Sequence, residues 1–188
     1  MTTSKILAIS GSLRADSHNT QLLRAAQKFN PGGLDIEIYE GLRDIPAYDL
    51  DLDTPEVRPA AVEALRRRVT EADGVLIATP EFNYSIPGVL KNAIDWLSTD
   101  WTRAEGVPLR RKPTAILGAG PGAFGTVRAQ LALRQIFVCV DADVVVKPEV
   151  HVFKSYERFD DAGNLVDEAT IELLQDLLGA LKGKIDAA

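Results

Sequence analysis

The side chains best suited to contact a ligand lie in the segment 79–96, which follows an apolar run ending at Ala78. Open α/β sheets bind ligands where a parallel strand ends just before a helix, and this segment occupies such a place. Pro80 and Pro87 fix the backbone angle φ and lack amide donors, which stiffens the loop between them. That loop presents acidic, amide, hydroxyl and aromatic groups: Glu81, Phe82, Asn83, Tyr84 and Ser85. The combination favours a flat, partly polar aromatic ligand, with an ordinary strand-to-helix connection as the alternative.

A second group of polar side chains follows the first apolar run, in the segment 10–20. Gly11 allows a tight turn there, and Arg14 adds a positive charge. The hydroxyl and amide side chains of the segment are Ser10, Ser12, Ser17, Asn19 and Thr20. A helix is expected to begin here, and its unpaired amides attract an anion. We therefore predict a site for a terminal phosphate, with a simple helix cap as the alternative; the segment lacks the Gly-Lys-Ser/Thr ending of a P-loop.

A third segment, 118–125, is rich in glycine and formally contains Gly-x-Gly-x-x-Gly from Gly120 to Gly125. The dinucleotide-binding version of that pattern follows the first strand and is completed by an acidic residue after the next strand. Here the pattern follows the fourth expected strand, and Asp141 and Asp143 precede the next one. We expect Gly120 and Gly122 to let the backbone lie against a ring system, with a merely flexible loop as the alternative.

Few other side chains offer chemistry. Glu81 serves either as a general acid or base or as the structural partner of an arginine such as Arg128. The two histidines, His18 and His151, lack nucleophile or metal-ligand spacing, so we interpret each as a surface or capping residue and predict no metal site. Cys139, the only cysteine, lies among apolar residues and is expected to be buried.

The pattern of the chain predicts the scaffold that positions these segments. Apolar, β-rich runs predict strands at 5–10, 34–39, 74–79, 114–117 and 144–147. Amphipathic patterns predict helices at 19–29, 59–72, 87–98, 125–140 and 167–181. This alternation predicts an α/β fold, a flavodoxin-like three-layer sandwich around a five-stranded parallel sheet in the order 2-1-3-4-5. The connections 40–58 and 99–112 are unusually long, and in them Tyr48 and Trp101 are either functional or passive surface.

Composition limits the class of protein. A length of 188 residues, 46% hydrophobic and 26% charged, suits one globular domain over residues 1–188. The net charge of −6 argues against nucleic-acid and anionic-membrane partners. No apolar run approaches the roughly 20 residues that span a bilayer. The amino-terminal Met-Thr-Thr-Ser-Lys lacks a signal-peptide layout, and one cysteine forms no internal disulfide, so we expect a cytoplasmic protein.

The three site-forming segments together resemble the NADPH-dependent FMN reductase family, in particular its bacterial quinone and chromate reductase branch. The resemblance is carried by Gly11-Ser12-Leu13-Arg14, Ser17-His18-Asn19, the run from Pro80 to Trp96, Leu133-Arg134-Gln135 and Lys147-Pro148-Glu149. It implies that the FMN phosphate is bound by Ser10, Ser12, Arg14, Ser17, Asn19 and Thr20. It implies that the isoalloxazine ring is lined by Pro80, Glu81, Phe82, Asn83, Tyr84 and Ser85, and that its pyrimidine side packs on Gly120 and Gly122. The family usually has Tyr at the position of Phe82, so a contact by that hydroxyl is absent.

The resemblance implies an FMN-dependent NAD(P)H oxidoreductase. NADPH or NADH would pass a hydride to FMN, and in a ping-pong cycle a quinone, azo or nitro compound, free flavin or oxidised metal ion would accept the electrons. The flavin carries the chemistry, and no catalytic side chain is expected. Two alternatives remain: a flavodoxin-like electron-transfer protein without NAD(P)H activity, and a Rossmann-type dehydrogenase that binds no flavin.

The resemblance also implies a homodimer, and in some members a tetramer. The helices expected at 87–98 and 125–140 carry more apolar surface than one sheet face needs, in the residues Trp96, Leu131, Ile136 and Phe137. The expected partners across subunits are Arg128, Glu149 and Tyr84. The branch often has Tyr at the position of Leu131, so a tetramer contact through that hydroxyl cannot form here.

Overall fold

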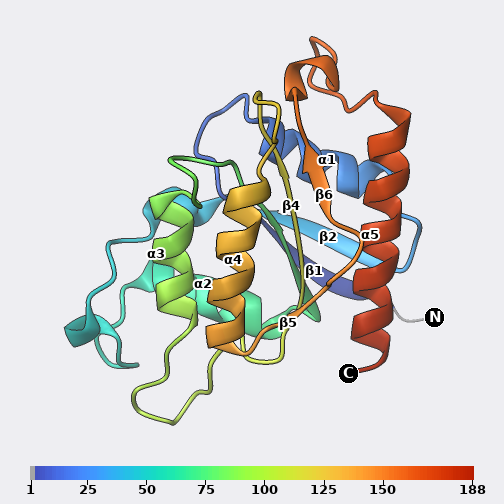
Figure 1. Ribbon diagram of the computed structural model, residues 1–188. Coiled ribbons are helices and arrows are strands. Elements are labelled where there is room, and N and C mark those ends of the chain that lie inside the picture. The colour runs from blue at the N-terminus through green and yellow to red at the C-terminus, as the bar shows by residue number, and fades with distance from the viewer. Residues whose placement is uncertain (1–2) are drawn as a thin grey trace.

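The computed structural model describes residues 3–188 and contains a parallel sheet with helices on both faces (Figure 1). Met1 and Thr2, the start of the stretch without a signal-peptide pattern, lie outside the described residues. The strands are β1 (Ser4–Ser10), β2 (Leu34–Tyr39), β3 (Gly74–Ala78), β4 (Pro113–Ala119), β5 (Asp143–Val144) and β6 (Val150–Val152). The main path of the sheet is β2-β1-β3-β4-β5, which confirms the predicted order.

Among the described residues, four α-helices connect strands and a fifth follows the last strand, and short 3₁₀ turns lie in the longer loops. The helices are α1 (His18–Lys28), α2 (Ala60–Glu71), α3 (Gly88–Leu97), α4 (Val127–Val140) and α5 (Glu168–Asp186). The predicted end of the last helix at 181 was wrong, because Ile185 still packs against the buried cluster below the helix. Within residues 3–188, no helix is both long and apolar enough to cross a membrane.

The predicted fifth strand at 144–147 was also wrong in its bounds. The structure divides it into β5 and β6, which both pair with β4: Thr114 lies opposite Val144, and Leu117 opposite Val150. Pro148 interrupts the ladder between them because it has no amide to donate. The consequence for the site is that the chain after β6 reaches the same sheet edge as the chain after β4 (Figure 1).

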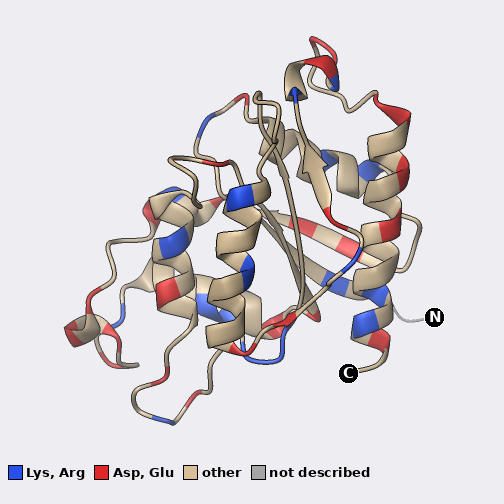
Figure 2. Ribbon diagram, viewed as in Figure 1, with Lys and Arg blue, Asp and Glu red and all other residues tan. Residues whose placement is uncertain are grey.

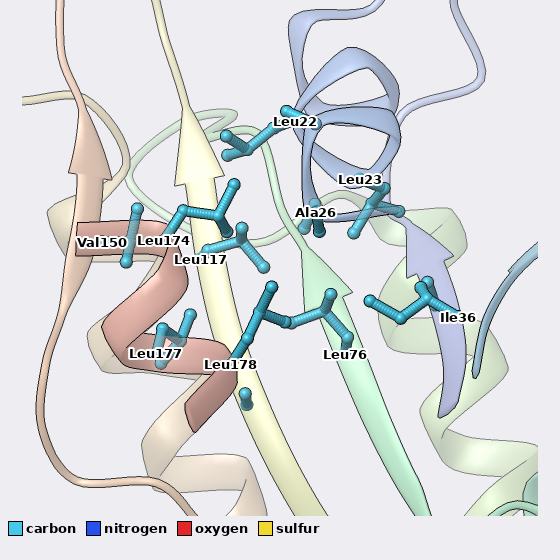
Figure 3. Close-up of a cluster of buried hydrophobic side chains, with 14 of the residues drawn as sticks. Leu22, Leu23, Ala26, Ile36, Leu76, Leu117, Val150, Leu174, Leu177 and Leu178 are labelled. Carbon is cyan, nitrogen blue, oxygen red and sulfur yellow. The ribbon is translucent and has the colours of Figure 1, made fainter. Parts of the chain in front are cut away.

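Alternate residues of the strands belong to two separate apolar clusters, one on each face of the sheet, because successive side chains of a strand point to opposite faces. Ile6 and Ala8 of β1 belong to the cluster beneath α1 and α5, whereas Leu7 and Ile9 belong to the cluster beneath α2, α3 and α4. Figure 3 shows the first cluster, in which leucines of α1 and α5 meet Leu76 and Leu117 of the central strands. The central strands are covered on both faces, as their continuous apolar sequences require.

Two expectations about apolar side chains were wrong. Trp96 and Phe137, assigned to a surplus apolar surface, are fully buried in the second cluster. Cys139, expected to be buried, is exposed. It lies two residues after the buried Phe137, and a helix turns by about 200° over two residues, so its side chain points away from the sheet.

The connection 40–58 contains a buried ion pair, to which the connection 99–112 is joined by a hydrogen bond. The carboxylate of Asp53 accepts from Arg58 Nε at 3.1 Å, and the exposed fractions of the two side chains are only 1% and 2%. The hydroxyls of Tyr48 and Thr99 donate to the other oxygen of Asp53, which joins segment 40–58 to segment 99–112. Trp101 donates from Nε1 to the hydroxyl of Tyr48 at 3.0 Å. These contacts give Tyr48 a structural role.

Replacing Asp53 by Ala is expected to lower the free energy of unfolding by about 1–3 kcal/mol, because Arg58 Nε and the hydroxyls of Tyr48 and Thr99 lose their buried acceptor. Arg58 keeps Glu63 and Glu105, each at 2.9 Å from its Nη1, so its charge stays paired. Urea denaturation measures the change. The matched control is Asp51→Ala, an exposed position in the same segment, which should shift stability by less than about 0.5 kcal/mol. Equal, small effects of the two substitutions would contradict this role of the ion pair.

Candidate functional site

The carboxyl ends of β1, β3, β4 and β6 meet at one edge of the sheet, at the top of Figure 1. The strand order reverses between β1 and β3, so the loops after these two strands diverge and leave a crevice. A cavity of about 340 Å³ lies there. It is lined by Ser12, Arg14, Ser17, His18, Asn19, Pro80, Phe82, Ala119, Pro121, Ser155 and Tyr156. All three predicted segments contribute to it, and a fourth, after β6, joins them.

The first loop is fixed to the rest of the edge by Asn19. Its side-chain amide donates to the carbonyl of Ala119 and its oxygen accepts from the Ala119 amide, both at 2.9 Å. Ser17 caps α1, since its hydroxyl oxygen accepts from the Asn19 amide at 3.2 Å. The side chain of Asn19 therefore positions the loop and makes its hydrogen bonds within the protein, whereas the hydroxyl proton of Ser17 stays available to a ligand.

Two residues of the predicted phosphate segment lie behind the loop. Ser10 and Thr20 pair through their hydroxyls at 2.9 Å and line a second cavity of about 230 Å³. That cavity lies between the first loop and the chain after β2, where Arg24 and Arg43 also line it. Ser12 and Arg14 border both cavities.

The loop after β3 closes into a tight hairpin at residues 82–85. The amide of Phe82 donates to the Ser85 carbonyl at 2.9 Å, and the Ser85 amide donates back at 3.0 Å. Asn83 and Tyr84 between them have φ values of 52° and 66°, the positive pair that a two-residue hairpin turn requires. Positive φ is unfavourable for tyrosine, so this turn holds strained backbone beside the cavity. Phe82 lines the cavity, whereas Tyr84 does not line it and is 71% exposed.

Glu81 anchors this hairpin to α4. One carboxylate oxygen accepts from Arg128 Nε at 2.6 Å, and the other accepts from the amides of Arg128 and Ala129 in the first turn of α4. A carboxylate at a helix N-terminus also interacts favourably with the helix dipole. The Arg128 guanidinium in turn lies 4.0 Å from the ring centroid of Tyr84. Of the two roles considered for Glu81, the structural pairing with Arg128 is confirmed.

The glycine loop is packed against β6 and does not line the cavity through its glycines. The Gly120 amide donates to the Val152 carbonyl at 2.9 Å, and its own carbonyl accepts from Ser155. A Cβ atom on Gly120 would lie 2.8 Å from the carbonyl oxygen of Gly125, so glycine is required there for close backbone packing. Gly122 is exposed and meets no such obstacle. The cavity wall at this loop is made by the flanking Ala119 and Pro121.

His18, Ser155 and Tyr156 line the cavity although the sequence did not assign them to a site. His18 Nδ1 lies 2.8 Å from Ser155 Oγ, and the imidazole stacks on Phe159 with 4.7 Å between ring centroids. Burial and then the charge of Arg14 hold the pKa of His18 below its ordinary value. Ser155 and Tyr156 follow β6, the strand that pairs with β4, so their place at the end of a strand could have indicated them. The prediction missed them because it placed the fifth strand at 144–147.

Comparison with known proteins places this site in context. Residues 4–157 match the family described as NADPH-dependent FMN reductase. An NAD(P)H-dependent FMN reductase of Pseudomonas aeruginosa is 46% identical over 178 residues, which cover 95% of this chain and 93% of that protein. A quinone reductase of Escherichia coli is 41% identical over 177 residues, which cover 94% and 92%. The solved flavoenzyme FerB, an NAD(P)H:(acceptor) oxidoreductase from Paracoccus denitrificans, has a TM-score of 0.87 at 32% identity over 98% of both chains.

The chain belongs to the NADPH-dependent FMN reductase family. Membership in this family confirms the predicted resemblance, the flavodoxin-like fold class and the enzyme class, an oxidoreductase that works with FMN and NAD(P)H. As a member of the FMN reductase family, the chain is expected to use the cavity at the sheet edge, and the residues that bind each group there stay predictions.

Replacing Glu81 by Ala is expected to lower the free energy of unfolding by about 1.5–3 kcal/mol, because Arg128 and two helix amides lose a charged partner. Glu81→Gln should cost less, since its amide oxygen still accepts from the backbone. The control Asp95→Ala removes the exposed pair with Lys91 and should cost less than about 1 kcal/mol. Unchanged stability together with lost turnover in Glu81→Ala would contradict a purely structural role and favour a general acid or base.

Proposed function

We propose that this chain is an FMN-dependent NAD(P)H oxidoreductase that reduces quinones and free flavin. The observation that carries the proposal is one cavity lined both by hydroxyls and an arginine at a helix N-terminus and by flat, mostly apolar walls. Ser12, Ser17 and Arg14 suit a phosphate, whereas Pro80, Phe82, Ala119 and Pro121 suit a ring system. The residues present therefore fit FMN, and the names of the relatives support the same acceptors.

In this proposal, the residues of the cavity bind and orient the FMN. When bound, FMN would supply the redox chemistry, hydride transfer from NAD(P)H and electron transfer to an acceptor. Arg14 and the hydroxyls of Ser12 and Ser17 would hold its phosphate at the start of α1. Phe82 of the hairpin at 82–85 would contact its ring, and Glu81 keeps that hairpin in place.

Exposed aromatic side chains in the loops that form the cavity account for a broad range of acceptors. Phe82 lines the cavity, Tyr84 and Phe124 lie in two of its loops, and each of the three is more than half exposed. Flat aromatic molecules stack on such side chains with little demand on their polar groups. We therefore extend the proposal to azo and nitro compounds and to oxidised metal ions. In this proposal the nicotinamide and the acceptor use the same exposed aromatic surface. The two therefore bind in turn, as a ping-pong cycle requires.

We also propose that residues 1–188 form a single FMN-binding domain and that the protein works in the cytoplasm. The support for the first is the way α1 and α5 share one apolar cluster, although they lie at opposite ends of the sequence. The support for the second is a composition with a single cysteine.

Purified protein is expected to bind FMN and to show the visible absorption of bound flavin. Under anaerobic conditions NADPH should bleach that absorption, and a quinone should restore it. Flavin that stays oxidised in NADPH would favour the electron-transfer protein, and protein that takes up no FMN would contradict the proposal.

The matched variant for this experiment is Arg14→Ala combined with Ser17→Ala. Each substitution removes a hydrogen bond to a charged group, worth roughly 1.5–3 kcal/mol, so the FMN should be lost on dialysis. Retention of FMN at the affinity of the natural sequence would show that the phosphate lies elsewhere.

We propose a homodimer that forms through α4, and a tetramer as a further step. Leu131 and Val138 are 58% and 83% exposed and lie seven residues apart, on one face of α4. Figure 2 shows α4 as a largely uncharged helix with basic positions only. An apolar face of this kind fits a second copy better than water. Arg128, Glu149 and Tyr84 have partners within the chain, and their contacts across subunits stay predictions.

Light scattering of the FMN-bound protein at micromolar concentration is expected to give twice the 20.4 kDa of one chain, or four times for a tetramer. Leu131→Glu combined with Val138→Glu should shift the mass to that of the monomer, because charges are then buried at the contact. A monomer mass for the natural sequence would contradict both assemblies.

A further inference from the structure

His18 occupies an unusual position for a histidine: it is the first residue of α1 and lines the cavity at the sheet edge. Its ring is held from two sides by the chain after β6. Phe159 stacks on one face with an interplanar angle of 10°, and Ser155 lies within hydrogen-bond distance of Nδ1. Within residues 3–188, Nε2 of the same ring makes no hydrogen bond. The ring is therefore fixed in orientation and has one nitrogen left for a ligand.

Ser155 suits both protonation states of this ring. Ser155 is only 1% exposed. Its hydroxyl can donate to an unprotonated Nδ1 of His18 or accept from a protonated one. Protonation of His18 thus does not break the contact that orients it. A buried acceptor such as a carbonyl would have favoured only the forms with a proton on Nδ1.

The charges around His18 disfavour its cationic form as long as no anion is present. The charge of Arg14 lowers the pKa of His18, and the positive end of α1 adds to this effect. The first turn of α1 holds no carboxylate. On the other elements, the charged or titratable groups are Asp16, Lys154, Tyr156, Glu157 and Arg158, with Lys154 paired to Glu157 and Arg158 to Asp167. Glu81, in the loop after β3, is committed to Arg128. Burial and Arg14 are the causes that lower the pKa of His18, and no carboxylate is among them.

We propose that His18 is a proton-linked ligand of the flavin phosphate, which it binds as an imidazolium and so helps the site choose FMN over unphosphorylated riboflavin. The inference rests on the proposed function, and it identifies the flavin phosphate as the anion that stabilises the protonated ring of His18. Arg14, Ser17 and His18 line the same cavity, so a phosphate bound there would bring up to two negative charges to the imidazole. FMN binding then takes up a proton.

The sign of the pH dependence follows from this charge change. The pKa of His18 is low without FMN and rises when the phosphate binds. Affinity for FMN is therefore strongest at a pH below the pKa of His18 in the FMN-free protein. It falls by up to tenfold per pH unit between that pKa and the higher pKa of His18 in the FMN-bound protein. The phosphate itself titrates near pH 6, so wild-type protein must be compared with a variant that lacks only the imidazole.

Proton NMR tests the proposal on the natural sequence, which has only two histidines. His18 should titrate at higher pH in the presence of FMN and should not respond in this way to riboflavin. The signal of His151, which lies beside Glu149 and outside the cavity lining, should keep its pKa. His151→Gln assigns the two signals. A His18 titration that FMN leaves unchanged would overturn the proposal.

Fluorescence titration with His18→Gln supplies the second test. At about pH 6 the variant should bind FMN about tenfold more weakly than the natural sequence, and at about pH 8.5 the two should differ by less than about threefold. Riboflavin should bind both equally, and His151→Gln should behave as the natural sequence. A ratio that stays the same at both pH values would overturn the role of His18. Absence of FMN binding by the natural sequence would instead contradict the proposed function.

Discussion

Two hydrogen bonds between the side chain of Asn19 and the backbone of Ala119 determine the geometry of the candidate site. They join the loop after β1 to the end of β4, a hundred positions away, and cross the end of β3 between them. Because the side chain of Asn19 is buried, water does not compete for these bonds. The start of α1 is thereby held over the sheet at a fixed distance from the wall made by Ala119 and Pro121. An anion bound at α1 and a ring bound at that wall must match this distance.

A second anchor positions the remaining wall. Glu81 joins the hairpin after β3 to the first turn of α4, so the loops after β3 and β4 keep their separation. The strained backbone at Asn83 and Tyr84 persists because the ion pair of Glu81 with Arg128 and the contact of the Arg128 guanidinium with the Tyr84 ring hold the turn. With Asn19 and Glu81 used for positioning, the groups left to meet a ligand are hydroxyls, Arg14, His18 and the flat faces of Pro80 and Phe82. That division of labour fits a family in which a cofactor carries the chemistry.

The sheet order and most helices could be predicted because apolar periodicity is a local signal. Strand alternation in segments such as 5–10 and 74–79 allowed few topologies. The fifth strand could not be placed by the same signal, since Val144 and Val150 pair with β4 on either side of Pro148. Cys139 was misassigned because its neighbours in sequence are apolar whereas its face of α4 is not covered.

The candidate site was predicted as a set of loops rather than as a set of contacts. Strand ends identify the loops, so the prediction included Ser12, Ser17 and Phe82, which line the cavity. Which side chains face the cavity depends on packing that no local pattern reports. Ser10 and Thr20 turn behind the loop, and Ser155 approaches His18 from 137 positions away.

FMN is expected to lie with its phosphate at the start of α1 and its ring between the hairpin at 82–85 and Pro121. A crystal structure of the protein with bound FMN measures this most directly. The expected result is a phosphate within hydrogen-bond distance of Ser17 and Arg14. A phosphate in the second cavity, beside Arg24 and Arg43, would contradict the assignment of the site.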